Sequence, residues 1–161
     1  MEYVIIFWYM SDNRNPIPTV DVILQKGSEI LLIKRKNEPL KDHLSLPGAF
    51  VNQWEKVETA ALREVNEETS LEIDPVDILG AYSDPKRDPR RHILTVVFIG
   101  IILKGVPNPK DDSSAIQWIQ LDDIQKKDLA LIINRYFLTT FNGERQEEPF
   151  LNPFWTVQSV I

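Results

Sequence analysis

The sequence predicts an α/β fold, an α/β/α sandwich in which helices cover a mixed sheet. Runs of β-branched and aromatic residues, separated by turns that contain Pro, Gly and Asn, predict strands along most of the chain. Two segments, Glu55–Thr69 and Leu129–Phe141, are instead predicted to be helices, the first because its apolar residues recur at helical spacing. Strands that flank helices in this order favour a layered α/β domain.

The N-terminal half of the chain is predicted to form three strands before the first helix. Tyr3–Tyr9 is β-branched and aromatic, so we expect a strand there. Thr19–Leu24 follows a loop with two prolines and predicts the second strand. Glu29–Lys36 returns as the third strand after a turn at Gly27. The change of period at Glu55–Thr69 then marks the helix.

The C-terminal half alternates strands with polar loops. Val76–Tyr82 and the long, β-branched His92–Leu103 predict strands on either side of a charged loop. A short strand is expected at Ala115–Gln120, and Leu121–Lys126 predicts the start of a helical turn. The sheet is therefore expected to contain segments from both halves of the chain.

Composition limits the class of protein. The chain has 161 residues, 43% of them hydrophobic and 26% charged, which predicts one globular domain over residues 1–161. The absence of cysteine excludes disulfides and thiolate metal sites and suits the reducing cytoplasm. A net charge of -6 disfavours binding to nucleic acid or to an anionic membrane. The apolar opening, MEYVIIFWYM, is too short to span a bilayer.

The predicted first helix carries three glutamates on one face. At about 100° per residue, Glu64, Glu67 and Glu68 lie within roughly 100° of one another. Like charges at this spacing destabilise a helix, so stability alone does not explain them. Clustered carboxylates suit a hard divalent cation that bridges to substrate phosphates. A solvated acidic face is the alternative interpretation of these residues alone.

The residues around the glutamates resemble the box of the Nudix hydrolase family, G-x5-E-x7-R-E-U-x-E-E-x-G-U, where U is aliphatic. The matching segment spans residues 48–71. Seven positions agree in register: Glu55, Arg63, Glu64, Val65, Glu67, Glu68 and Leu71. The resemblance implies a Nudix-type fold and a metal-dependent pyrophosphatase.

The resemblance also implies a role for each matching residue. Glu64 and Glu68 are expected to be direct metal ligands, Glu67 a ligand directly or through water, and the Gly48 carbonyl to complete the shell. The implied cofactor is Mg²⁺, with Mn²⁺ as the second choice. Glu64 and Glu67 are also candidate general bases. A structural ion pair is expected between Glu55 and Arg63.

Three positions depart from the family pattern. Ala49 and Ser70 stand where the box has glycines, and Trp54 replaces a glycine common just before the first glutamate. Glycines at such places usually permit a positive φ or a close approach of the backbone. A substituted residue at positive φ costs about 1 kcal/mol. We expect an active site all the same, because every acidic ligand is present.

The loop at residues 82–92 holds four cations between two predicted strands, and arginines there can bind a phosphate. A charged hairpin loop is the alternative. The loop resembles the Y-S-D-P-x-R-D-P-R-x-H segment of archaeal and bacterial ADP-ribose pyrophosphatases. It also resembles the Nudix domain of regulators of NAD metabolism. The first resemblance implies hydrolysis of ADP-ribose to AMP and ribose 5-phosphate, with Arg87 and Arg90 contacting the substrate.

Three further residues are candidates for the site. Arg35 ends a predicted strand and is expected to contact a phosphate or to be a surface arginine. Phe50 is expected to stack on an adenine or to pack in the core. Many relatives use a loop glutamate as general base, and Asp112 is the best substitute in the corresponding segment here.

The sequence is also compatible with other functions. One is a Nudix pyrophosphatase for another nucleoside diphosphate derivative or a nucleoside triphosphate, and another is a non-catalytic ADP-ribose-binding module. About twenty residues follow Phe141, too few for the winged-helix domain of the regulators, so we expect the enzyme. The aromatic segments Tyr3–Tyr9 and Phe150–Trp155 suggest a homodimer interface.

Overall fold

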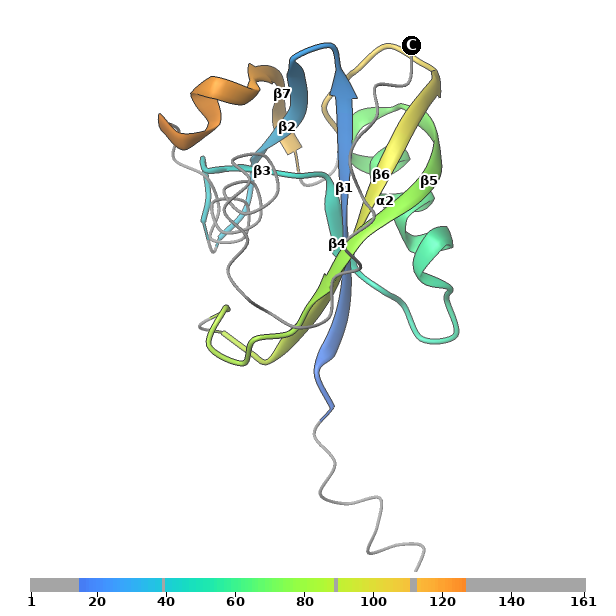
Figure 1. Cartoon of the computed structure of the whole chain (residues 1–161), viewed down its shortest axis with the longest axis vertical. Coiled ribbons are helices and arrows are strands. Elements are labelled where there is room, and N and C mark those ends of the chain that lie inside the picture. Colours follow the sequence, from blue (N-terminus) through green and yellow to red (C-terminus); the bar gives the residue numbers. More distant parts are fainter. Residues whose placement is uncertain (1–14, 39, 89, 111–112, 127–161) are drawn as a thin grey trace, which may run out of the picture.

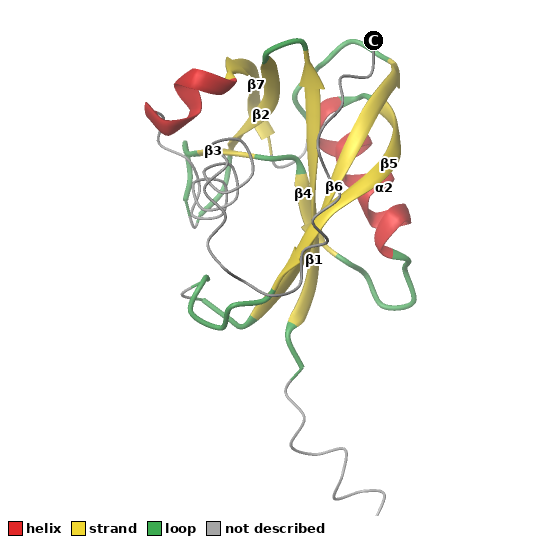
Figure 2. Cartoon of the chain, viewed as in Figure 1, coloured by secondary structure: helices red, strands yellow, loops and turns green. Residues whose placement is uncertain are grey.

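The computed structural model describes residues 15–38, 40–88, 90–110 and 113–126 (Figure 1). The strand predicted at Tyr3–Tyr9 and the helix predicted at Leu129–Phe141 lie outside these residues. A mixed sheet and an α-helix make an α/β fold, as predicted (Figure 2). The second helical layer of the predicted sandwich depends on residues 129–141 and stays a prediction.

The strands fall into one sheet whose main path runs β3-β2-β1-β6-β5, with β4 paired to β1 and β7 paired to β2. The β1–β6 pairing is parallel and the other pairings are antiparallel, so the sheet is mixed. The strands are β1 (Ile17–Lys26), β2 (Glu29–Arg35), β3 (Leu44–Ser45), β4 (Gly48–Phe50), β5 (Glu72–Tyr82), β6 (Ile93–Lys104) and β7 (Ser113–Gln120). The helices are α2 (Val57–Thr69) and the short 3₁₀ helix η1 (Leu121–Lys126).

The sequence-based prediction of the longer elements is confirmed, with bounds that differ by a few residues. α2 begins at Val57, two residues after the predicted start, because Glu55 belongs to the preceding loop. The strands β3 and β4 were not predicted. They have two and three residues, too few to show an alternating pattern, and they form only by pairing with β2 and β1.

The central strand β1 separates two apolar clusters. Val20, Val22 and Leu24 point to the cluster that contains Ala61 and Val65 of α2. Ile23 points to the opposite face, with buried residues of β2 and β6. Each fully buried aliphatic side chain stabilises the fold by about 1.5–3 kcal/mol, so this packing fixes α2 against the sheet.

Two sets of backbone hydrogen bonds position the ends of α2. Before the helix, β4 pairs with β1 and places Gly48 opposite Asp21. After the helix, the amides of Asn108 and Lys110 donate to the carbonyls of Thr69 and Glu68. In the part of the chain described here, none of the helices combines the length and the apolar character needed to cross a bilayer.

Candidate active site

The acidic face of α2 is divided between buried and exposed carboxylates. Glu64 and Glu68 lie one turn apart and are only 8% and 6% exposed. Glu67 is much more open, with 47% of its side chain accessible. Glu64 and Glu68 share the helix face that carries Ala61 and packs toward the sheet, so their charges are directed inward.

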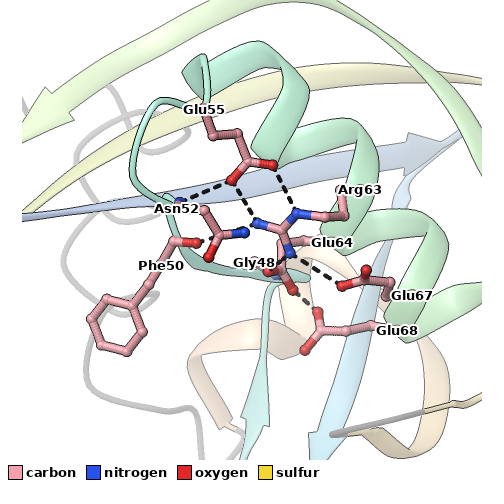
Figure 3. Close-up of polar contacts among 8 residues, drawn as sticks. All are labelled: Gly48, Phe50, Asn52, Glu55, Arg63, Glu64, Glu67 and Glu68. Carbon is pink, nitrogen blue, oxygen red and sulfur yellow. Dashed lines mark hydrogen bonds and ion pairs between the residues drawn. The ribbon is translucent and has the colours of Figure 1, made fainter.

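Arg63 connects the helix to the preceding loop (Figure 3). Its Nε and Nη2 each donate to one oxygen of Glu55 at 2.8 Å, a bidentate pair. Its Nη1 donates to Glu64 and, at 3.1 Å, to Glu67. Nη2 also reaches the carbonyl of Phe50 at 3.4 Å. One guanidinium therefore holds the loop and two of the three glutamates together.

These contacts shift the pKa of the groups involved. Hydrogen bonds from Arg63 lower the pKa of Glu55 to about 2, and the amide of Asn52 contributes in the same direction. Burial raises the pKa of Glu64, while Arg63 acts in the opposite direction. Glu55 therefore stays ionised at any physiological pH, whereas burial and the Arg63 cation act on the Glu64 carboxyl in opposite directions.

Gly48 approaches the glutamates so closely that a side chain does not fit there. Its amide donates to Oε2 of Glu68 at 2.9 Å. A Cβ at this position would overlap the Val20 carbonyl oxygen and would lie 2.7 Å from Oδ1 of Asp21. A glycine is therefore required where the loop passes between β1 and α2.

The chemistry of the donor set fits a hard divalent cation. Glu64, Glu67 and Glu68 supply carboxylate oxygens, and Gly48 brings its backbone beside Glu68. Over residues 15–38, 40–88, 90–110 and 113–126, no three His, Cys, Asp or Glu side chains are gathered closely enough to form a ready-made metal cage. Arg63 occupies Glu64 and Glu67 instead, so it supplies the positive charge that balances these acids.

The three residues that depart from the box pattern differ in backbone conformation. Trp54 and Ser70 have φ values of 67° and 62°, in the region that favours glycine, whereas Ala49 is not among the described residues with positive φ. Trp54 is 94% exposed, so its ring does not pack in the core. Ser70 caps α2, and its hydroxyl donates to the carbonyl of Asn108 at 3.2 Å.

The two arginines of the basic loop that were predicted to bind substrate, Arg87 and Arg90, both contact other residues of the protein. Arg87 is only 8% exposed, and its Nη2 donates to Thr95 Oγ1 at 2.6 Å. Arg90 makes a bidentate pair with the buried Asp88 at 2.9 and 2.6 Å, and this pair lowers the pKa of Asp88. His92 Nε2 lies 2.9 Å from the Ser83 carbonyl, where it can donate and close the loop. Arg87 is thus part of the sheet face, and Arg90 is the more exposed cation.

The remaining predicted residues lie in different places. Arg35 ends β2 opposite Ser113, whose hydroxyl donates to the Glu68 carbonyl at 2.7 Å, so Arg35 lies near the end of α2. The Phe50 side chain is half exposed and points away from the glutamates (Figure 3). Asp112, the predicted loop base, lies outside the described residues.

Asp21 is a candidate that the sequence-based prediction did not include. It lies on β1 opposite Gly48 and is partly exposed. Burial raises the pKa of its carboxyl to about 7, and the charges of Arg87 and Arg35 act in the opposite direction. In the sequence it is a single acid between Val20 and Val22, in the strand predicted at Thr19–Leu24.

Comparison with known proteins gives consistent matches. A family model described as the NUDIX domain matches residues 15–141. The chain is 43% identical over 112 residues to the ADP-ribose pyrophosphatase of Methanocaldococcus jannaschii, covering 70% of this chain and 66% of that protein. It is 32% identical over 127 residues to the ADPR responsive transcriptional repressor NtrR of Acinetobacter baylyi, covering 74% of this chain and 51% of that protein.

A solved structure is similar over a comparable range. The structure of a MutT/nudix family protein from Enterococcus faecalis matches with a TM-score of 0.62 and 32% identity, covering 74% of this chain and 51% of that chain. This chain therefore spans 66% or less of the length of each of these three proteins.

Proposed function

The chain belongs to the NUDIX family, and from this premise we propose that it is a metal-dependent pyrophosphatase that hydrolyses ADP-ribose to AMP and ribose 5-phosphate. The observation that carries the proposal is the pair of buried carboxylates, Glu64 and Glu68. They lie beside Gly48, a position where the backbone leaves no room for a side chain. Burying two acids one turn apart is costly unless a cation is bound nearby. Arg63 balances the charge of Glu64, and a bound cation would balance both acids together.

In this proposal, Glu64 and Glu68 hold a divalent cation together with the Gly48 carbonyl, and Glu67 joins them directly or through water. Mg²⁺ is the preferred ion because it takes oxygen ligands and binds phosphates, and Mn²⁺ is the second choice. When bound, the cation neutralises the diphosphate and polarises its phosphorus–oxygen bonds.

The protein residues divide the remaining work. Water adds to one phosphorus of the diphosphate, the bridging P–O bond breaks, and the departing phosphate takes the bond's electron pair. Glu67 is exposed enough to accept the proton from this water, and Glu64 and Asp112 are the other candidate bases. Arg63 keeps the loop and the helix in register through its bidentate pair with Glu55.

ADP-ribose is the proposed substrate for two reasons. The M. jannaschii relative, at 43% identity, carries the name ADP-ribose pyrophosphatase. The loop at residues 82–92 offers Arg90 on its surface, held in a fixed direction by Asp88, where it can meet a phosphate. Arg35 and Phe50 are proposed to contact the remaining phosphate and the adenine.

The decisive experiment replaces Glu68 by Gln and measures hydrolysis of ADP-ribose with Mg²⁺. The amide oxygen of Gln can still accept the hydrogen bond from Gly48, so the fold should be retained while the charge is lost. We expect kcat to fall by at least about 100-fold. Glu58→Gln, at an exposed position on the first turn of the same helix, is the matched control and should keep wild-type kcat. A Glu68→Gln variant within threefold of wild type would contradict the metal assignment.

Two observations favour a second candidate, a non-catalytic ADP-ribose-binding module. Trp54 and Ser70 occupy left-handed backbone where the family pattern has glycine, and one relative is an ADPR responsive repressor. Metal-dependent turnover by the wild type separates the two functions. A panel of NADH, diadenosine polyphosphates, nucleoside triphosphates and GDP-sugars tests the other pyrophosphatase activities in the same assay.

The proposal extends to assembly and location. We place the protein in the cytoplasm because a cysteine-free chain suits a reducing compartment. We also propose a homodimer, built on the aromatic segments at Tyr3–Tyr9 and Phe150–Trp155. Light scattering on the purified chain should give twice the monomer mass, and a monomer at micromolar concentration would overturn this part.

A further inference from the structure

Asp21 lies between the glutamate site and the basic loop, and the proposed mechanism assigns it no role. Residues alternate across β1, so Val20 and Val22 pack under α2 while Asp21 and Ile23 point to the opposite face of the sheet. Asp21 is of intermediate burial, so part of the residue remains accessible to a ligand. A carboxylate in a central strand destabilises the fold unless it is paired or hydrogen-bonded.

On one side, Asp21 adjoins the loop that carries the proposed metal ligands. It pairs with Gly48 across the β1–β4 ladder, and a Cβ on Gly48 would lie 2.7 Å from its Oδ1. The Gly48 amide is bonded to Glu68 at 2.9 Å. The Asp21 carboxylate is therefore separated from Glu68 by a single backbone segment.

On the other side, Asp21 adjoins the sheet face occupied by Arg87. Thr19, two residues before Asp21 on the same face, lies 2.7 Å from the hydroxyl of Thr95, and that hydroxyl accepts from Arg87. The positive charges of Arg87 and Arg35 both lower the pKa of the Asp21 carboxyl, against the larger effect of burial. Asp21 is therefore a largely buried carboxyl on a partly accessible residue, within reach of the electric field of two arginines.

We propose that Asp21 is a substrate-positioning residue that accepts hydrogen bonds from ribose hydroxyls adjacent to the diphosphate. A carboxylate repels phosphate oxygens, whereas hydroxyl groups are the donors it binds well. In ADP-ribose, the groups on either side of the diphosphate are riboses, and Asp21 lies one backbone segment from the proposed diphosphate site. The inference rests on the proposed function for the identity of the ligand.

The test measures binding by calorimetry without added metal, so it does not depend on turnover. Wild type, Asp21→Asn and Asp74→Asn are titrated with ADP-ribose, AMP, ribose 5-phosphate and inorganic pyrophosphate. Asp74 is an exposed aspartate on β5 and serves as the matched control. We expect Asp21→Asn to bind ADP-ribose about tenfold more weakly, because a charged acceptor becomes a neutral one. Pyrophosphate, which lacks hydroxyls, should bind no more weakly, and Asp74→Asn should match wild type throughout.

The smaller ligands identify which ribose is bound. A loss confined to AMP assigns Asp21 to the adenosine ribose, and a loss confined to ribose 5-phosphate assigns it to the terminal ribose. Unchanged ADP-ribose affinity in Asp21→Asn overturns the inference, as does an equal loss for pyrophosphate or a lower unfolding midpoint that tracks the lost affinity. A wild type that binds ADP-ribose but shows no turnover with Mg²⁺ contradicts the proposed function alone. A wild type that binds ADP-ribose neither without metal nor with Mg²⁺ overturns both.

Discussion

The glutamate helix with its loop (residues 48–71) and the basic loop (residues 82–92) are both rich in charge but hold it differently. In the first region, Arg63 is shared by Glu55, Glu64 and Glu67, so several acids converge on one cation. In the second, Arg90 is bound by its own neighbour, Asp88, two residues away. The first arrangement brings three carboxylates to one arginine. The second fixes the orientation of a single arginine side chain.

The difference shows which charges are available for chemistry. Helical spacing brings Glu64 and Glu68 together whatever the surrounding loops do, and the apolar cluster beneath α2 keeps them in place. The basic loop depends on contacts with other strands, such as that of Arg87 with Thr95 of β6. The proposed function accordingly assigns the catalytic chemistry to the first region and the selection of the substrate to the second.

Gly48→Ala should cause the largest loss, because it breaks the first region at its tightest point. The added Cβ overlaps backbone atoms of β1 that cannot move away as a flexible side chain would. We expect β4 to shift and the Glu68 contact to be lost, with a destabilisation of about 1–3 kcal/mol. A displacement of about 1 Å at a catalytic centre lowers kcat/KM by about 100-fold. Steady-state kinetics and urea unfolding measure the two effects.

Ala49→Gly is the control on the neighbouring residue. Ala49 lies in the same short strand, yet its φ is not positive and its side chain is tolerated. Restoring the family's glycine there should change kcat/KM less than threefold and destabilise the strand by about 0.5–1 kcal/mol. If Gly48→Ala and Ala49→Gly lose activity equally, the clash of a Cβ at position 48 with β1 is not the cause of the loss.

Substituting the acidic partner of each arginine, Glu55 for Arg63 and Asp88 for Arg90, should show whether the two regions have different roles. Glu55→Gln weakens the hold on Arg63, which then binds Glu64 and Glu67 more closely, so we expect kcat to fall by about tenfold. Asp88→Asn releases Arg90, so KM should rise by about threefold while kcat stays the same. A loop variant that changes only kcat would contradict the division of roles.

The same pair of variants predicts a pH dependence. Hydrogen bonds lower the folded-state pKa of Glu55 from 4.5 to about 2 and also lower that of Asp88. A lowered folded pKa adds stability that is present above the unfolded pKa and is lost as the pH falls through the folded value. The difference in melting temperature between wild type and Glu55→Gln should therefore shrink from pH 5 to about pH 2. A difference that is constant over this range would show that charge is not its source.

The sequence predicts the first region far better than the second for a physical reason. The box residues are close in sequence, so helical geometry alone places Glu64 and Glu68 on one face of α2. Long elements such as β1 and β6 are also predictable, since each repeats its pattern over many residues. The short strand at Gly48–Phe50 exists only through its pairing with β1, and no local pattern indicates it.

Residues whose role depends on tertiary contacts could not be predicted. Arg87 and Arg90 look alike in the sequence, yet Arg87 is buried against Thr95 whereas Arg90 stays partly exposed. Asp21 resembles an ordinary polar interruption of a strand until β4 brings Gly48 beside it. These placements depend on which strands pair, a property set by the whole chain.

The smallest expected effect concerns Ser70, where the first region departs from its family pattern. Ser70 ends α2 with φ 62° and ψ 16°, a conformation that a glycine adopts without strain. Ser70→Gly removes about 1 kcal/mol of strain but loses the hydroxyl contact with Asn108 and gains freedom in the unfolded chain. Ser70→Ala loses the same contact and keeps the strain, so the glycine variant should be more stable than the alanine variant by about 1 kcal/mol in urea unfolding.

Both Ser70 variants should keep kcat within about threefold, because Glu68 is anchored separately by Gly48 and Ser113. Equal stabilities of the two variants would mean that the strain relieved in the left-handed turn is no larger than the entropy cost of glycine in the unfolded chain.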